Sequence, residues 1–186
     1  MKTAVLLLTL VAAGCRTAAT AHPGDALWSA LQPLCGKAFE GRLIEGSEPS
    51  DAKIGAERLV IHVRSCTDGE IRIPFQVGND RSRTFVLTRT AAGVRLKHDH
   101  RHADGTPDQL TEYGGDTRGA SDALRLQFFA DAETAAMLPA AASNVWTLAI
   151  EEGRTFTYAL HRERSDRRFR VDFDLSNPVP DPPPPW

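Results

Sequence analysis

The stretch "ERLVIHVRSCTDGEIRIPFQVG", residues 57–78, decides the fold. Its first half alternates, with Leu59, Ile61 and Val63 on one face, and its second half alternates again after "TDG". Alternation with period two is typical of a half-buried strand, and Asp-Gly favours a tight hairpin turn because it tolerates positive φ. The stretch therefore predicts an antiparallel hairpin. Pro74 has no N–H for the ladder, which predicts an edge strand or a bulge at that position.

The same pattern continues through the rest of the chain and predicts about nine strands joined mostly by short turns, an all-β antiparallel meander. No βαβ alternation is present, so a parallel sheet is not expected. We expect a closed barrel, with a two-sheet sandwich as the alternative. Leu27, Leu31 and Leu34 predict a short amphipathic helix ahead of the strands, with Asp25 as its N-cap and Pro33 at its end. This helix is expected to pack on the sheet as a lid or plug.

Composition describes an ordinary globular chain. It has 186 residues, 41% of them hydrophobic, and a net charge of −2. A chain of this size can bury one core, and the balanced charge does not indicate a nucleic-acid partner. We expect three parts: a signal peptide over residues 1–21, a single β domain over 22–176, and a proline-rich tail over 177–186.

The first residues, "MKTAVLLLTLVAAGC", resemble an export signal. A positive Lys2 precedes an apolar run too short to span a bilayer as a mature helix. "AAGC" resembles a bacterial lipobox, which would make Cys15 a lipid-modified N-terminus, although Ala12 stands where leucine is usual. The alternative is an ordinary cut before His22, after "ATA". The expected location is an inner- or outer-membrane lipoprotein facing the periplasm, or a soluble periplasmic or secreted protein.

The cysteine count agrees with export. Without Cys15, the chain keeps Cys35 and Cys66, which an oxidising compartment would allow to form a disulfide. The loop they close is about thirty residues, for which chain entropy gives a stabilisation of about 3–4 kcal/mol. No CxxC is present, so neither a redox motif nor a zinc knuckle is indicated.

The candidate functional residues lie in "GVRLKHDHRHADG", residues 93–105. On a strand, His98, His100 and His102 follow Val94 and Leu96 on one face. The other face carries only charged residues, Arg95, Lys97, Asp99 and Arg101, which are expected to meet water. The three histidines are therefore expected to line the interior of the barrel or its mouth.

These histidines raise the possibility of zinc or copper binding. Neighbours two apart on a strand are about 6.5–7 Å apart, so two imidazoles could share one ion, but a third ligand must come from elsewhere. The interpretation favoured over metal is a set of interior histidines paired with carboxylates or aromatic rings. Polar ligand binding is the remaining alternative. The candidate third ligands are Asp104, Asp108, Glu112 and His161.

Several blocks carry a resemblance: "LCGKAFEGRL", "GVRLKHDHRHADG", "YGGDT" and "FRVDFDL" with "PPPPW". Together they resemble a family of small, uncharacterised bacterial secreted proteins and lipoproteins, which implies no particular activity. "TEY" at 111–113 and the helix-then-meander order are also similar to the lipocalin (calycin) superfamily. That similarity implies a lipocalin-like barrel, but the G-x-W motif and the closing helix of that superfamily are missing.

Three functions follow as hypotheses. The first is a non-enzymatic envelope protein whose barrel binds a small molecule or peptide. The second is a metal-binding protein or metalloenzyme that uses the histidine strand. The third is a structural module without a ligand, with the proline-rich tail as a contact for a protein partner. We favour packing of the tail along its own barrel, with Trp186 as an anchor. The only expected link to a membrane is a lipid anchor.

Overall fold

The computed structural model describes residues 22–118 and 122–186, so Cys15 and both cleavage sites lie outside the described residues. Eleven strands form one antiparallel sheet, in the order β2-β1-β11-β10-β9-β8-β7-β6-β5-β4-β3. The strands are β1 (Ala38–Gly46), β2 (Leu59–His62), β3 (Ser65–Cys66), β4 (Glu70–Val77), β5 (Asp80–Thr90), β6 (Gly93–His100), β7 (Tyr113–Thr117), β8 (Arg125–Ala130), β9 (Asn144–Glu151), β10 (Thr155–Arg162) and β11 (Arg168–Val179). The helices are α1 (Asp25–Leu31), α2 (Pro49–Gly55) and α3 (Ala132–Met137), with 3₁₀ turns η1 (Gln32–Leu34) and η2 (Pro139–Ala141).

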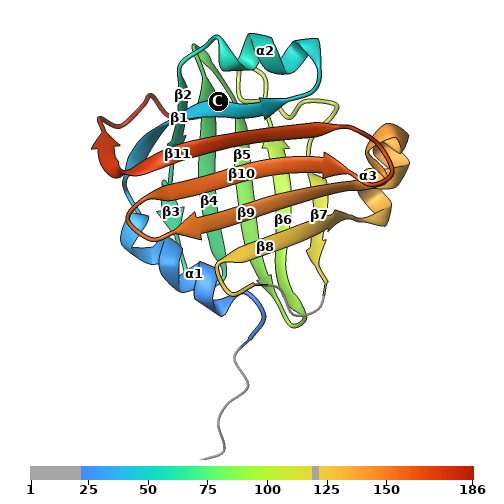
Figure 1. The fold of residues 1–186 in the computed structure, drawn as a ribbon, viewed down its shortest axis with the longest axis horizontal. Coiled ribbons are helices and arrows are strands. Elements are labelled where there is room, and N and C mark those ends of the chain that lie inside the picture. Colours follow the sequence, from blue (N-terminus) through green and yellow to red (C-terminus); the bar gives the residue numbers. More distant parts are fainter. Residues whose placement is uncertain (1–21, 119–121) are drawn as a thin grey trace, which may run out of the picture.

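The sheet closes on itself into a ten-stranded barrel (Figure 1), which confirms the expected barrel and excludes the two-sheet sandwich. Closure comes from β2, which pairs with β1 on one side and with β4 on the other. The β2–β4 seam is short, because only Leu59, Val60 and Ile61 have partners on β4. β3 then pairs with the earlier part of β4. Closure leaves few unpaired strand edges.

Two strands were missing from the expected count of about nine. The run 57–66 is not one strand but two, β2 and β3, because the chain leaves the ladder after His62. Pro74 lies in β4 between the part that pairs with β3 and the part that pairs with β2. Pro74 therefore lies where the neighbour of β4 changes from β3 to β2. Because β4 has neighbours on both sides, the predicted edge strand is wrong.

The second missing strand is β7, which contains the adjacent glycines Gly114 and Gly115. A Cβ on Gly114 would lie 2.0 Å from the Leu96 carbonyl oxygen, and one on Gly115 would lie 1.6 Å from that of Phe129. Only glycine allows the backbones to approach this closely. The double glycine is therefore what lets β7 fit between β6 and β8.

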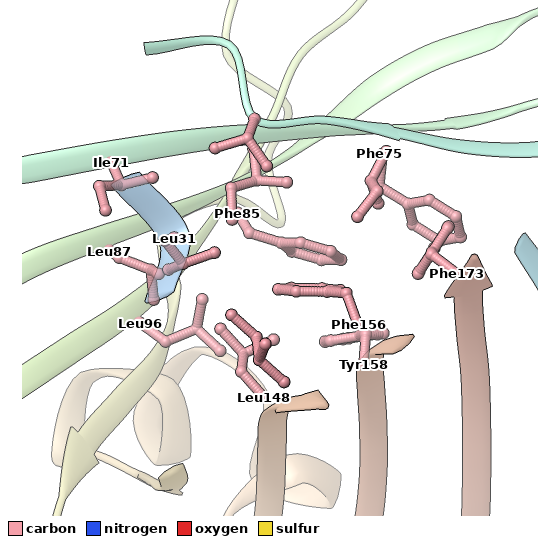
Figure 2. Close-up of a cluster of buried hydrophobic side chains, with 14 of the residues drawn as sticks. Leu31, Ile71, Phe75, Phe85, Leu87, Leu96, Leu148, Phe156, Tyr158 and Phe173 are labelled. Atoms are coloured by element: carbon pink, nitrogen blue, oxygen red, sulfur yellow. The ribbon is translucent and has the colours of Figure 1, made fainter. Parts of the chain in front are cut away.

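Alternating side chains fill the barrel, and α1 closes its lower end in Figure 1. Leu27 and Leu31 of α1 are fully buried, and Figure 2 shows Leu31 reaching toward Ile71 and Leu87 of the barrel wall. The predicted plug is therefore confirmed. The N-cap prediction is wrong by one residue: Gly24 is the N-cap, and the Asp25 carboxylate accepts the His22 N–H at 2.8 Å.

A disulfide joins Cys35, just after η1, to Cys66 of β3, with the two Cα atoms 6.2 Å apart. This confirms the predicted pair and ties the plug to the wall. Within residues 22–118 and 122–186, no helix is long and apolar enough to cross a lipid bilayer.

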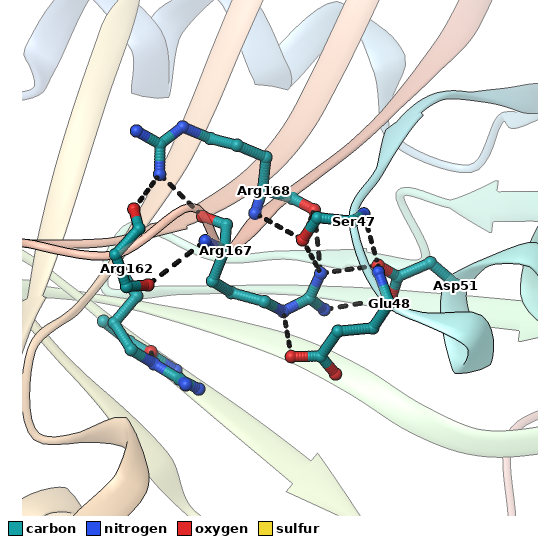
Figure 3. A network of polar contacts seen from close by, with 8 residues as sticks. Ser47, Glu48, Asp51, Arg162, Arg167 and Arg168 are labelled. Carbon is teal, nitrogen blue, oxygen red and sulfur yellow. Dashed lines mark hydrogen bonds and ion pairs between the residues drawn. The ribbon is translucent and has the colours of Figure 1, made fainter.

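Helix α2 lies at the opposite end of the barrel from α1 (Figure 1) and was not predicted. Figure 3 shows how it is held: the Arg167 guanidinium, from the β10–β11 turn, donates to both Asp51 carboxylate oxygens at 2.5 and 2.9 Å. Arg167 also lies 3.2 Å from the Glu48 carboxylate. Asp51 is almost completely buried, so this is a paired internal charge that fixes α2 to the turn.

Candidate functional site

His98 lies inside the barrel, as predicted, with 1% of its surface exposed. Its Nδ1 lies 3.1 Å from the Tyr113 carbonyl oxygen, which can only accept, so Nδ1 carries the proton. Nε2 is then free to accept the Tyr158 hydroxyl proton, at 2.9 Å. Burial lowers the pKa of His98 to about 3. His98 is therefore a neutral imidazole with both nitrogens bonded to the barrel itself.

Aromatic rings occupy the space around His98. Tyr113 stacks on it at 4.6 Å between ring centroids, while Trp146 and Phe85 lie at 5.2 and 5.4 Å. Tyr158 stacks in turn on Phe85 at 4.4 Å. These rings are in direct contact, so the imidazole of His98 faces protein and not a ligand. The expectation of interior histidines paired with aromatic groups describes this residue.

His100 lies at the mouth of the barrel and is half-buried. Its Nε2 lies 3.1 Å from the Tyr113 hydroxyl oxygen. The pKa of His100 is lowered, first by burial and then by the charge of Arg83, against the opposing effect of Asp108 and other carboxylates. Tyr113 thus links the two histidines, since its carbonyl contacts His98 and its hydroxyl contacts His100.

His102 and Asp104 do not join this group, which corrects the prediction. β6 ends at His100, and the chain turns back so that the His102 N–H donates to the Thr106 carbonyl at 2.9 Å. Asp104 accepts the Thr106 N–H and hydroxyl at 2.9 and 2.6 Å. Both side chains are exposed. The Asp-Gly turn at 104–105 takes them out of the strand, so alternation cannot be extended to His102.

The metal hypothesis has no geometric support in the part of the chain that the structure describes. No three His, Cys, Asp or Glu side chains group there closely enough to hold a metal ion. Of the proposed third ligands, Asp108 accepts the Leu110 N–H at 2.9 Å. His161 follows Tyr158 and Leu160 of β10 and points to the outside of the barrel.

The charged face of β6 also needs a correction, because Asp99 is only 4% exposed. Arg72 reaches it from β4, with a guanidinium nitrogen 2.6 Å from the carboxylate, and the Arg101 Nε lies at 3.1 Å. The two arginines cover the carboxylate where water was expected. Lys97 is covered in the same way by Asp131 and Glu133, at 2.8 and 3.1 Å.

The clearest apolar hollow lies at the other end of the barrel, beside α1. It is a half-open groove of about 610 Å³, a size typical of small-molecule sites. Its lining is mostly apolar and includes Ala26, Ala30, Leu34, Leu124, Ile150 and Leu175. We missed this groove. The available signal was the spacing of the small residues at 26, 29 and 30, which places them together on one helix face opposite the buried leucines.

Comparisons of this chain with family models, with curated proteins and with solved structures gave no match.

Proposed function

We propose that this chain is an exported, non-enzymatic binding protein that holds a small apolar molecule, or an apolar peptide side chain, in the groove beside α1. The observation that carries the proposal is the groove itself, an apolar hollow of about 610 Å³ beside a barrel whose interior is occupied by a cluster of buried hydrophobic side chains. Small residues on the α1 side leave the space open. Ser29 and Glu152 supply polar groups at the same site.

The barrel acts as a rigid scaffold in this proposal, and the interior is not the binding site. His98 and Tyr158 bond to each other and to the barrel, and the rings around them are in contact. A ligand in the interior would have to displace several buried aromatic side chains, each of which contributes substantially to the core. The groove needs no such displacement.

Export is supported by the N-terminal segment and by the disulfide. Cys35 and Cys66 are paired, and such bonds persist in oxidising compartments. The disulfide also fixes one side of the α1–η1 segment, which would keep the groove in shape during binding. Lipid modification at Cys15 remains part of the proposal, with a start at His22 as its alternative.

Binding is tested with the neutral, apolar dye N-phenyl-1-naphthylamine, whose fluorescence increases in apolar surroundings. We expect saturable binding to the wild-type chain at about one dye per protein. Ala26→Trp places an indole in the groove and should reduce dye affinity by about tenfold or more, which corresponds to roughly 1.4 kcal/mol.

The matched control is Gln32→Trp, which adds the same indole to an exposed position just after α1 that does not line the groove. It should bind the dye as the wild type does. Equal loss in both variants, or no saturable binding in the wild type, would contradict the proposed site. Circular dichroism of each variant confirms that the barrel is intact.

A further inference from the structure

The C-terminal tail lies across the outside of the barrel. β11 ends at Val179, which pairs with Ala38 of β1, and residues 180–186 continue beyond the ladder. Asp181 lies 4.0 Å from His62 of β2, and the last residue donates its N–H to the carbonyl of Arg81 at the start of β5. The tail therefore passes over β2 and β4 to β5, and Figure 1 shows the C-terminus over this part of the barrel.

The tail lies in a groove on the outer surface of the barrel. Outward-facing side chains normally meet water, but those in this groove are covered. His62, Pro74 and Gln76 alternate with inward-facing residues, so they point outward. His62 is nevertheless 5% exposed and Pro74 is buried. The space left between the tail prolines and the wall at Pro74, Gln76 and Arg81 is about 10 Å³, room for no more than one water. The tail fits this surface closely.

Arg81 makes the contacts that recognise the end of the tail. Its guanidinium donates to the Pro184 carbonyl at 2.8 Å and lies over the Trp186 ring, 5.6 Å from the centroid. Its own carbonyl accepts the Trp186 N–H at 3.3 Å. Proline-rich segments have free carbonyls and a preformed extended backbone, and protein grooves bind them through contacts of this kind.

The tail is held by the Arg81 contacts, by Asp181 beside His62 and by close packing, and not by strand pairing. No β-ladder extends past Val179, and the Asp181 side chain is 68% exposed although it faces His62. The tail can therefore leave the groove without breaking a strand pairing. What it would uncover is a preformed site that already accommodates four consecutive prolines and a tryptophan.

We propose that the outer face of β2, β4 and β5 is a polyproline-binding groove, which the tail fills in cis and which accepts a proline-rich segment with an aromatic residue after its prolines from a partner protein. The tethered tail competes at an effective concentration of roughly millimolar, so it keeps the groove closed to weak ligands. The groove is separate from the apolar groove beside α1, so the two proposals fail independently.

The test uses a full-length chain in which residues 180–186 are replaced by a Gly-Ser segment of equal length. A fluorescein-labelled peptide of residues 178–186, PVPDPPPPW, is titrated with this chain and followed by fluorescence polarisation. We expect saturable binding at least about tenfold tighter than to the wild type, because the competing tail is gone. The same peptide with alanine at 182–185 should not bind.

Adding Arg81→Ala to the Gly-Ser chain should abolish binding, whereas Arg125→Ala, an exposed position on β8 away from the groove, should not change it. Absence of peptide binding to the folded Gly-Ser chain overturns the proposal, and so does binding that ignores Arg81. If the Gly-Ser chain does not fold, Trp186→Ala in the natural chain replaces it, and binding no tighter than the wild type then overturns the proposal. Dye binding to the α1 groove, measured in parallel, reports separately on the proposed function.

Discussion

At the scale of single residues, His98 shows how the barrel treats a titratable group. Its Nδ1–H donates to a carbonyl and its Nε2 accepts a hydroxyl proton, an arrangement that only the neutral ring satisfies. Its pKa falls from an ordinary 6.5 to about 3. The unfolded chain therefore binds a proton more readily than the folded chain throughout this interval. The contribution of the neutral His98 ring to the free energy of unfolding is complete above about pH 6.5 and is lost as the pH falls toward 3.

We therefore expect the free energy of unfolding in urea to fall between pH 7.5 and pH 5 by up to about 1.4 kcal/mol per pH unit below the ordinary histidine pKa. His98→Gln keeps a donor and an acceptor but does not titrate, so its stability should change less over the same interval. The pKa values of His62, His100 and His161 are also lowered, so these residues account for the remaining dependence of the unfolding free energy on pH in both proteins. Identical slopes for the two proteins would show that His98 is not the source.

The interior position of His98 could be predicted from the alternation of side chains along its strand. The burial of Asp99 could not be predicted in this way, because alternation gives only the direction of a side chain and not what covers it. Arg72 lies twenty-seven positions earlier in the chain, and its contact with Asp99 depends on two strands being brought together by β5. His102 was placed wrongly because the turn at Asp104 and Gly105 ends the strand two residues before it.

At the scale of elements, the long alternating segments were predicted and the short ones were missed. α2 has only seven residues, too few to establish a helical period. Its start was nonetheless visible in the sequence: Pro49 stands at the first helical position, and Glu48 and Asp51 form a capping box. The small residues of α1 were a signal for one wall of the groove beside it. The other wall could not be predicted, because it depends on how the β9–β10 turn lies against the helix.

The ion pair between Asp51 of α2 and Arg167 gives a prediction at this scale. Arg167→Met keeps the aliphatic stem but leaves the buried Asp51 carboxylate without its cation, so we expect a loss of about 3–5 kcal/mol in the free energy of unfolding. The control is Arg154→Met, which breaks an exposed ion pair with Glu151 in the β9–β10 turn and should cost less than about 1 kcal/mol. Asp51→Asn combined with Arg167→Met removes both charges and should recover part of the loss. Equal stability of the two single variants in urea would contradict this role.

At the scale of the whole molecule, the barrel was predictable because the sequence alternates almost from end to end. Its closure was not, because the β2–β4 seam has three residue pairs and β2 is four residues long. Two features lie close to this seam. The tail crosses its outer side, and the Cys35–Cys66 disulfide joins the plug to β3, beside the same strand β4. Both add contacts beside a seam that has only three residue pairs.

The last prediction concerns the compartment in which the whole chain folds. The disulfide closes a loop of 31 residues, for which chain entropy gives a contribution of about 3–4 kcal/mol, a large part of the stability of a domain this size. We therefore expect the protein to mature where this bond can form. Intact-mass analysis of membrane-fraction protein should show a chain that begins at a lipid-modified Cys15 and has no alkylatable thiol after unfolding without reductant. A soluble chain that begins at His22 would exclude the lipid anchor while keeping export. Two alkylated thiols at Cys35 and Cys66 would remove the disulfide, and with it the main structural support for export.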